Sequence, residues 1–173
     1  DGDLPECWDQ VADLITGAGF GLELAEDATA LGSANGVTDM VRRHVTIRGD
    51  LAGAQRFKTA VHELAHIRLH EPGSDGRPDC RGVVEVEAES VAYMVCGSVG
   101  IDSADYSLPY VAAWSGGDLD KVTATANRVT SAARQLIDQL GRDRTLHHTR
   151  QAVVDKVRDV KGAWEMAIEP DLA

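Results

Sequence analysis

The sequence has 173 residues, of which 43% are hydrophobic, and it carries a formal net charge of −11. This length suits one domain with an ordinary core, and no apolar run approaches the roughly 18 residues of a membrane-spanning helix. The acidic balance argues against direct nucleic-acid binding by this domain, because such binding rests on cationic contacts to phosphate. It favours solubility or a basic protein partner.

We expect a single domain over residues 1–173, with a core over about residues 4–140 and a helical or tail-like extension over residues 141–173. The sequence begins at Asp1 without an initiator methionine, a basic region or a signal-type apolar segment. A fragment or processed form of a cytoplasmic protein is therefore expected. The cysteines are odd in number and unpatterned, which predicts reduced thiols in an intracellular protein: Cys7, Cys80 and Cys96.

The N-terminal part of the chain predicts a helix followed by a small sheet. Residues 4–17 carry apolar side chains at helical spacing, and residues 20–24 alternate as a strand does. Asn35-Gly36 is a turn signal, and residues 37–47 then predict one or two further strands. An edge strand of such a sheet can hold an extended peptide. Which strand forms that edge does not follow from the sequence.

The next element is a helix that carries His-Glu-x-x-His. Asp50 is a candidate N-cap, and Pro72-Gly73 predicts a stop. His62 and His66 are four residues apart, so a helix places both imidazoles on one face, where they can bind one Zn²⁺. Glu63 follows the first histidine, and its carboxylate can take a proton from a metal-bound water. A helix that carries two histidines by chance is the weaker interpretation.

The motif supplies two ligands, so a third must come from elsewhere. One class of zinc proteases extends the motif to His-Glu-x-x-His-x-x-Gly-x-x-His. This chain has Leu69 at the glycine position and Pro72 at the last histidine position, which excludes that class. His70 lies on nearly the same face as His66, but too far along the helix to share a metal with His62 easily.

Residues 83–96 predict a third helix, which can supply the third ligand. Glu85 and Glu89 lie one turn apart on a common face, whereas Glu87 points about 200° around the axis from Glu85. Glu85 follows His66 at a spacing close to that of thermolysin-like enzymes, in which a helical glutamate binds zinc and an acid four residues later orients a histidine. We therefore rank Glu85 first as the ligand, Glu89 second and Glu87 last, and expect Glu87→Gln to be nearly silent. The alternative is a solvated acidic face.

These two segments resemble the ImmA/IrrE family of bacterial metallopeptidases. The resemblance is carried by residues 62–70, His-Glu-Leu-Ala-His-Ile-x-Leu-His, and by residues 85–92, Glu-x-Glu-Ala-x-x-x-Ala. It is closest to the zincin domain that follows an ArdC-like single-stranded-DNA-binding domain in some bacterial proteins. It continues through residues 100–114 and covers approximately residues 30–137.

The chain departs from this family at two places. The family often has Asn where Glu89 stands, and it ends this helix with a Leu-Leu-Met-Pro-like run where residues 94–97 read Met-Val-Cys-Gly. These departures affect the substrate groove and the part of Glu89 in orienting a histidine, and they leave the metal ligands unchanged.

The C-terminal half of the chain offers further candidates. Residues 101–114 are irregular and contain Tyr106 and Tyr110, which are possible transition-state donors, with packing against the core as the alternative. Residues 119–140 predict a long amphipathic helix, and residues 149–166 predict a further helix or a tail.

Taken together, the sequence predicts an α+β, zincin-like fold of thermolysin type, with a small sheet beside the motif helix and several further helices. Zn²⁺ would be held by His62, His66 and Glu85, with Glu63 as the general base and Glu89 behind a histidine ligand. The resemblance implies cleavage of a specific intracellular protein, such as a transcriptional repressor.

The alternative function is a zinc-stabilised antirestriction or interaction module with little or no peptidase activity, acting beside a DNA-binding domain outside this chain. The intact Glu63 favours the enzyme, because a structural zinc site needs no general base. A structural site is also usually closed by four protein ligands, and we nominate three. Asp75, Asp79 and Cys80 in the turn-rich loop over residues 71–82 are alternative ligands, but a solvated loop is the better interpretation of that segment.

Overall fold

A computed structural model describes residues 5–26, 28–72, 81–101 and 119–141 of the chain. This part is a mixed α+β structure. It contains the helices α1 (Trp8–Gly17), α2 (Gly53–His70), α3 (Arg81–Ser98) and α5 (Leu119–Leu140), the short 3-10 helix η1 (Ala28–Leu31), and the strands β1 (Gly21–Ala25), β2 (Gly36–Asp39) and β3 (His44–Arg48). In these ranges, no helix is both long and apolar enough to cross a bilayer.

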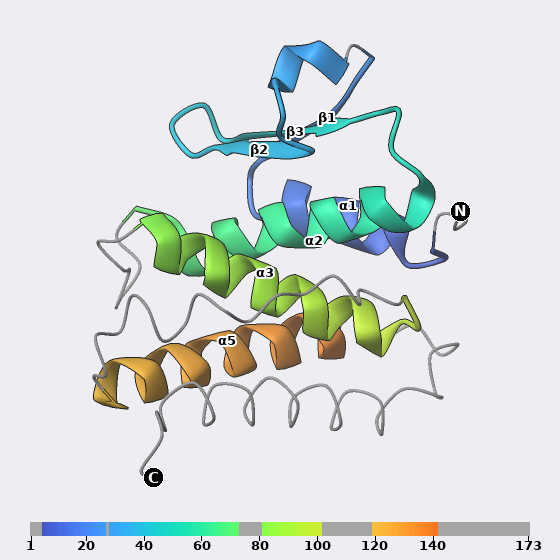
Figure 1. The fold of residues 1–173 in the computed structure, drawn as a ribbon. Coiled ribbons are helices and arrows are strands. Elements are labelled where there is room, and N and C mark those ends of the chain that lie inside the picture. The colour runs from blue at the N-terminus through green and yellow to red at the C-terminus, as the bar shows by residue number, and fades with distance from the viewer. Residues whose placement is uncertain (1–4, 27, 73–80, 102–118, 142–173) are drawn as a thin grey trace, which may run out of the picture.

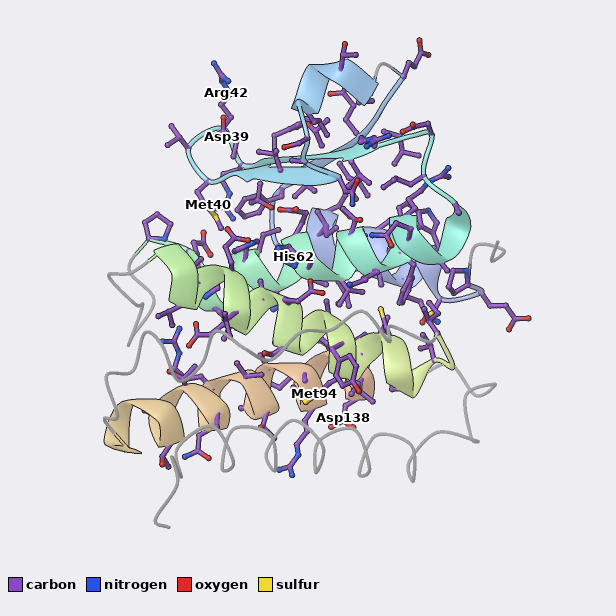
Figure 2. All side chains as sticks on the ribbon, in the orientation of Figure 1. Asp39, Met40, Arg42, His62, Met94 and Asp138 are labelled. Atoms are coloured by element: carbon purple, nitrogen blue, oxygen red, sulfur yellow. The ribbon has the colours of Figure 1, made fainter. Side chains whose placement is uncertain are left out.

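The three strands form one small sheet in the order β1-β3-β2. β1 runs parallel to β3, and β2 runs antiparallel to it, with Thr38 opposite Val45. Within the described residues, β1 and β2 are thus the edges of the sheet. Asp39 and Arg42 mark the turn that joins β2 to β3 (Figure 2).

Helix α2 is the centre of the arrangement. The sheet covers one side of it, α1 packs behind it, α3 lies on its other side, and α5 lies against α3 (Figure 1). The alternation along β3 turns Val45 and Ile47 toward the helices, where both are fully buried. Because α2 is covered on several sides, much of its surface is buried, including Phe57, Leu64 and Ala65. This burial fixes the face on which the motif histidines lie.

Several predicted boundaries differ from the structure. The first helix begins at Trp8 and not at residue 4. Asp50 is not the N-cap of α2, which begins at Gly53 after Ala52 and has no side-chain cap. The Asp50 carboxylate is instead paired with Arg48, 2.7 Å away. A capping residue three positions before a helix cannot reach its first free N–H groups, so the Asp50 interpretation was wrong.

The prediction of a turn at Asn35-Gly36 is also wrong, because Gly36 is the first residue of β2. The turn between β2 and β3 is instead built by Asp39, whose carboxylate accepts hydrogen bonds from the backbone N–H groups of Val41 and Arg42 at 3.0 and 2.8 Å. Arg43 then adopts a positive φ of 52°. This is an Asx-type turn, for which aspartate is a recognised signal.

Some predictions fall outside the described residues. These are the roles of Tyr106 and Tyr110, the thiol of Cys80, the helix or tail over residues 149–166, and the extension over residues 141–173 apart from Gly141. The helix predicted over residues 119–140 is confirmed with the same bounds.

Candidate metal centre

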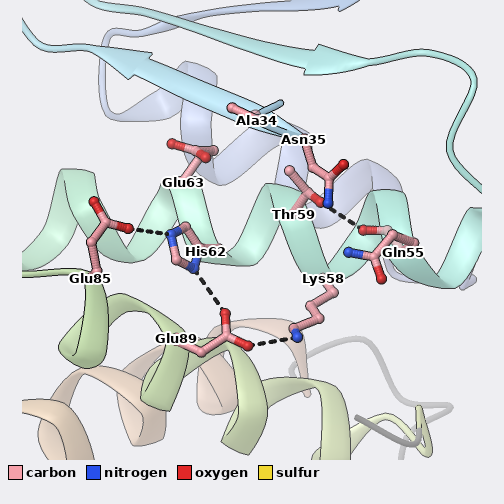
Figure 3. A pocket seen from close by; sticks show the side chains of 10 residues that line it. Ala34, Asn35, Gln55, Lys58, Thr59, His62, Glu63, Glu85 and Glu89 are labelled. Atoms are coloured by element: carbon pink, nitrogen blue, oxygen red, sulfur yellow. Dashed lines mark hydrogen bonds and ion pairs between the residues drawn. The ribbon is translucent and has the colours of Figure 1, made fainter. Parts of the chain in front are cut away.

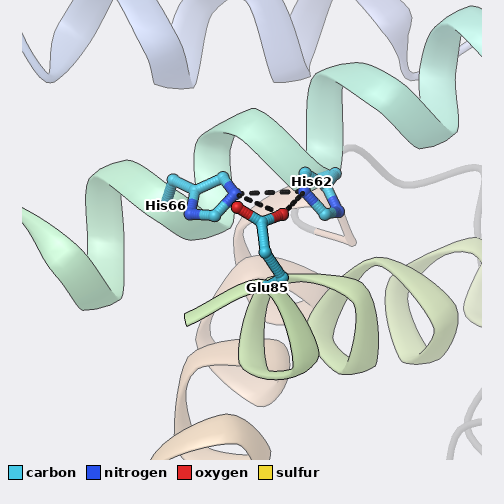
Figure 4. A group of neighbouring side chains, drawn as sticks. All are labelled: His62, His66 and Glu85. Atoms are coloured by element: carbon cyan, nitrogen blue, oxygen red, sulfur yellow. Dashed lines mark hydrogen bonds and ion pairs between the residues drawn. The ribbon is translucent and has the colours of Figure 1, made fainter. Parts of the chain in front are cut away.

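The two motif histidines of α2 and Glu85 of α3 come together at one point. The Nε2 atoms of His62 and His66 lie 3.0 Å apart. A carboxylate oxygen of Glu85 lies 3.4 Å from His62 Nε2 and 3.6 Å from His66 Nε2 (Figure 4). One donor atom from each of the three residues falls within 4.8 Å of the others. Two imidazole nitrogens and a carboxylate oxygen form a donor set that zinc accepts.

Hydrogen bonding within this cluster changes the acidity of its members. Burial lowers the pKa of His62, but its hydrogen bonds to Glu85 and Glu89 outweigh burial and raise the pKa to about 9. The hydrogen bonds from His62 and His66 hold the pKa of Glu85 well below its ordinary range. A His62 that is protonated at neutral pH offsets the negative charge of Glu85 and Glu89.

Glu89 lies behind His62, on the side away from Glu85. Its carboxylate is 3.1 Å from His62 Nδ1 and 2.6 Å from the Lys58 ammonium (Figure 3). Burial raises the pKa of Glu89, but these two partners outweigh it and bring the pKa to about 2. An ionised acceptor on Nδ1 keeps a proton there and leaves Nε2 to face Glu85.

Glu63 points from α2 toward the sheet. Its side chain is almost fully buried, and one carboxylate oxygen accepts a 2.7 Å hydrogen bond from the Thr38 hydroxyl on β2. Gly36 on the same strand lies so close that an added Cβ would stand 2.9 Å from the other oxygen. Glu63, His62 and Glu85 line one cavity of about 280 Å³ (Figure 3). The candidate base and two candidate ligands thus face the same space.

The hydrogen-bonded group of His70 and Glu87 behind His66 was not predicted from the sequence. Nδ1 of His66 is 3.0 Å from Nδ1 of His70, and Nε2 of His70 is 2.8 Å from a carboxylate oxygen of Glu87. The Arg128 guanidinium of α5 is 3.4 Å from the same oxygen. His70 and Glu87 are both almost completely buried, and burial lowers the pKa of His70.

The buried position of Glu87 is a physical reason to expect an effect of Glu87→Gln, where the sequence predicts that this variant is nearly silent. Glu87 does lie off the shared face of Glu85 and Glu89, as the helical period predicts, but that direction leads into the protein and not to solvent. The available signal was the spacing of His66 and His70, which puts both rings on one face of α2.

Comparisons with known proteins place few constraints on this chain. It is 28% identical over 128 residues to an uncharacterized protein of Bacillus anthracis, an alignment that covers 73% of this chain and 22% of the relative. The chain thus spans about a fifth of the length of that protein. No family model and no solved structure matches the chain.

Proposed function

We propose that this chain is a zinc-dependent metallo-endopeptidase domain of the ImmA/IrrE-like, zincin type. The observation that carries the proposal is the convergence of His62 and His66 from α2 with Glu85 from α3, with Glu63 facing the same cavity. A pair of helical histidines, a glutamate from a second helix and an adjacent buried carboxylate are the parts of a hydrolytic zinc site.

The donor set fits a catalytic zinc better than a structural one. Among the residues that the structure describes, three protein donors meet, which leaves a coordination position for water or substrate, whereas structural zinc is normally enclosed by four. The outer nitrogen of each histidine also has a partner, Glu89 for His62 and His70 for His66. Such support is typical of metal-binding imidazoles and is not expected of exposed acidic groups that gather without an ion.

In the proposed reaction, zinc supplies a Lewis acid for the scissile carbonyl and a water of lowered pKa. Glu63 would accept a proton from a water that attacks the scissile carbonyl carbon, and would deliver it to the amine nitrogen as the C–N bond breaks. The Thr38 hydroxyl bonds one Glu63 oxygen at 2.7 Å, which leaves the other oxygen for the water. The low exposure of Glu63 excludes bulk solvent from this transfer.

The substrate in this proposal is an extended segment of a specific intracellular protein. Strand β2 is an edge of the sheet among the described strands, and Gly36 at its start lines the cavity together with Glu63. A peptide that pairs with this edge would gain main-chain hydrogen bonds and pass beside the candidate base. The family resemblance suggests a transcriptional repressor as the substrate, and a DNA-associated partner or domain outside this chain.

The decisive experiment compares the wild type with Glu63→Gln on candidate repressors from the same cell, with cleavage followed by mass spectrometry. We expect both proteins to contain about one zinc by elemental analysis. Glu63→Gln should lose cleavage by at least about a hundredfold, the scale of acid–base catalysis. His62→Ala and His66→Ala should lose the metal.

Three results would count against this function. Full zinc content in both histidine variants would remove the metal site, and near-normal cleavage by Glu63→Gln would remove the base. A wild type that holds zinc but cleaves none of the candidate repressors would favour the interaction module in place of the peptidase.

A further inference from the structure

A line of polar side chains, buried at its two middle residues, runs from the candidate metal centre through three helices. It begins at His66 on α2, continues to His70 one turn later, crosses to Glu87 on α3 and ends at Arg128 on α5. The distances along it are 3.0 Å between the two Nδ1 atoms, 2.8 Å from His70 to Glu87 and 3.4 Å from Glu87 to Arg128.

The hydrogen-bond chemistry gives this line one direction. Glu87 is acceptor-only when ionised, so the His70 Nε2 that faces it must carry a proton. A neutral His70 then has a lone pair on Nδ1, and that atom must accept. His66 therefore donates from its own Nδ1. If His70 donated from Nδ1 to His66 instead, a neutral His70 would have no proton on Nε2. That nitrogen and the Glu87 oxygen would then be two acceptors facing each other, unless His70 carried a second proton.

The charges also suit a neutral His70. Arg128 is within 3.4 Å of the Glu87 carboxylate and donates a 3.1 Å hydrogen bond to the backbone carbonyl of Leu69. The buried negative charge of Glu87 thus has a permanent cation beside it, and His70 need not supply one. With Nδ1 of His66 occupied as a donor, its Nε2 keeps the lone pair that a metal requires.

We propose that His70 and Glu87 are positioning residues that hold His66 in the tautomer with a protonated Nδ1 and a free Nε2. This inference rests on the proposed metal site, and it assigns a task to two residues that the site itself does not use. It also makes the two histidine ligands unequal. His62 is held directly by the partly exposed Glu89, whereas His66 is held through a second histidine by a carboxylate with no exposed surface.

The buried carboxylate is costly, which favours a positioning task over a purely stabilising one. Glu87 is fully buried, and within the described residues its second oxygen has no hydrogen-bond partner. Apolar side chains of similar volume commonly replace buried ion pairs without loss of stability. Apolar side chains could not reproduce the hydrogen bonds by which Glu87 orients His70 and His70 orients His66.

The test uses the full chain and three variants. His70→Phe keeps a ring of similar size but removes both nitrogens, and His70→Gln restores an acceptor and a donor on one side chain. Val91→Ala is the matched control. Like Glu87, Val91 is fully buried on α3, but it lies outside the polar line. The first readout is ¹⁵N NMR of the imidazoles in the metal-free proteins, which reports the tautomer of His66 without any metal or activity.

We expect the wild type, His70→Gln and Val91→Ala to keep the Nδ1-protonated form of His66, and His70→Phe to show a mixture of tautomers. The second readout is competition for zinc with a chelator of known affinity. His70→Phe should bind zinc about 10–100-fold more weakly than the wild type, His70→Gln should recover most of this loss, and Val91→Ala should stay within about twofold.

The outcomes separate this inference from the proposed function. If the wild type binds zinc and His70→Phe changes neither the tautomer nor the affinity, the positioning role is overturned and the metal site stands. An equal loss in Val91→Ala would also overturn it, because general loosening of the core would then explain the effect. A wild type that binds no zinc would overturn the proposed function, and with it the role of His70 and Glu87 toward a metal.

Discussion

The Thr38 hydroxyl donates a 2.7 Å hydrogen bond to a carboxylate oxygen of Glu63, which ties strand β2 to the centre of helix α2. The same hydroxyl lies 3.4 Å from the backbone carbonyl of Glu63. A buried carboxylate that would otherwise choose among several rotamers is thus held in one of them. In the proposed reaction this contact sets which oxygen of Glu63 is free to take a proton.

Removal of the Thr38 hydroxyl should therefore slow cleavage without loss of zinc. We expect Thr38→Val to lower kcat about tenfold or more, because Glu63 would lose the group that orients it and its buried oxygen would lose a donor. Thr38→Ser keeps the hydroxyl and is the matched control. Steady-state kinetics and elemental analysis on both variants test this expectation. Equal rates for Thr38→Val and Thr38→Ser would show that the hydrogen bond does not matter for the reaction.

The three glutamates of α3 should differ in their effect on zinc affinity. Glu85→Gln should weaken zinc most, because Glu85 is the carboxylate within 3.6 Å of both histidine Nε2 atoms. Glu89→Gln should cost about 10–100-fold through His62. Glu87→Gln should also lower the affinity for zinc, because it removes the charge that faces His70. The sequence alone predicted almost no effect of this variant.

Chelator titration of the three glutamine variants measures this order directly. The matched control is Glu23→Gln on the exposed side of β1, far along the chain from α3 and outside the cavity lining. A Glu87→Gln loss larger than that of Glu85→Gln would contradict the assignment of Glu85 as the ligand.

Local sequence was sufficient for the parts of the site that lie on one element. The i, i+4 spacing of His62 and His66 dictates their common face on any helix, and the period of residues 83–96 places Glu85 and Glu89 together. The amphipathic pattern of α5 was strong enough to give its bounds, Leu119–Leu140, because a long periodic helix is the clearest signal in a sequence.

The contacts between elements could not be predicted in this way. Thr38 is 25 residues from Glu63, and nothing in the period of a strand indicates which hydroxyl will face a given helix. Glu87 appeared to be one more charged residue on an acidic stretch, and only the packing of α5 against α3 brings Arg128 close enough to permit its burial. The order β1-β3-β2, which makes β2 an edge, is likewise a property of the assembled sheet.

The pKa of His62 predicts that zinc binding releases a proton. At about 9 in the metal-free protein, this pKa leaves His62 protonated at pH 7.5. A zinc ligand must be neutral, so binding should release about one proton at this pH and the affinity should rise as the pH approaches 9. Calorimetric titration in buffers of different ionisation enthalpy measures the number of protons. No proton release at pH 7.5 would contradict a charged His62.

The same pKa shifts predict where the metal-free chain is most stable. The pKa of His62 is raised from 6.5, so its contribution to stability is fully present below pH 6.5 and is lost as the pH rises through 9. The pKa of Glu89 is lowered from 4.5 to about 2, so its contribution is present above pH 4.5 and is lost as the pH falls toward 2. The lowered pKa of the buried His70 costs stability as the pH falls below 6.5, so urea denaturation with a chelator present should show a maximum near pH 6.5, at the upper end of the range between these limits. Stability that increases from pH 6.5 to 9 would contradict this.

The close approach of Gly36 to Glu63 gives a prediction about stability and activity together. A Cβ at position 36 would lie 2.6 Å from the Thr59 methyl group and 2.9 Å from a Glu63 oxygen. Thr59 and Glu63 are both buried on α2, so neither can move far without displacing its neighbours. Gly36→Ala should therefore destabilise the protein by about 1–3 kcal/mol, as overpacking of a core does, and should lower cleavage by displacing Glu63.

Gly17→Ala is the matched control, because Gly17 ends α1 and has no atom within 4 Å of the added Cβ. Urea denaturation and cleavage assays on the two variants decide the matter: an equal response in both would mean that β2 does not confine the Glu63 side chain.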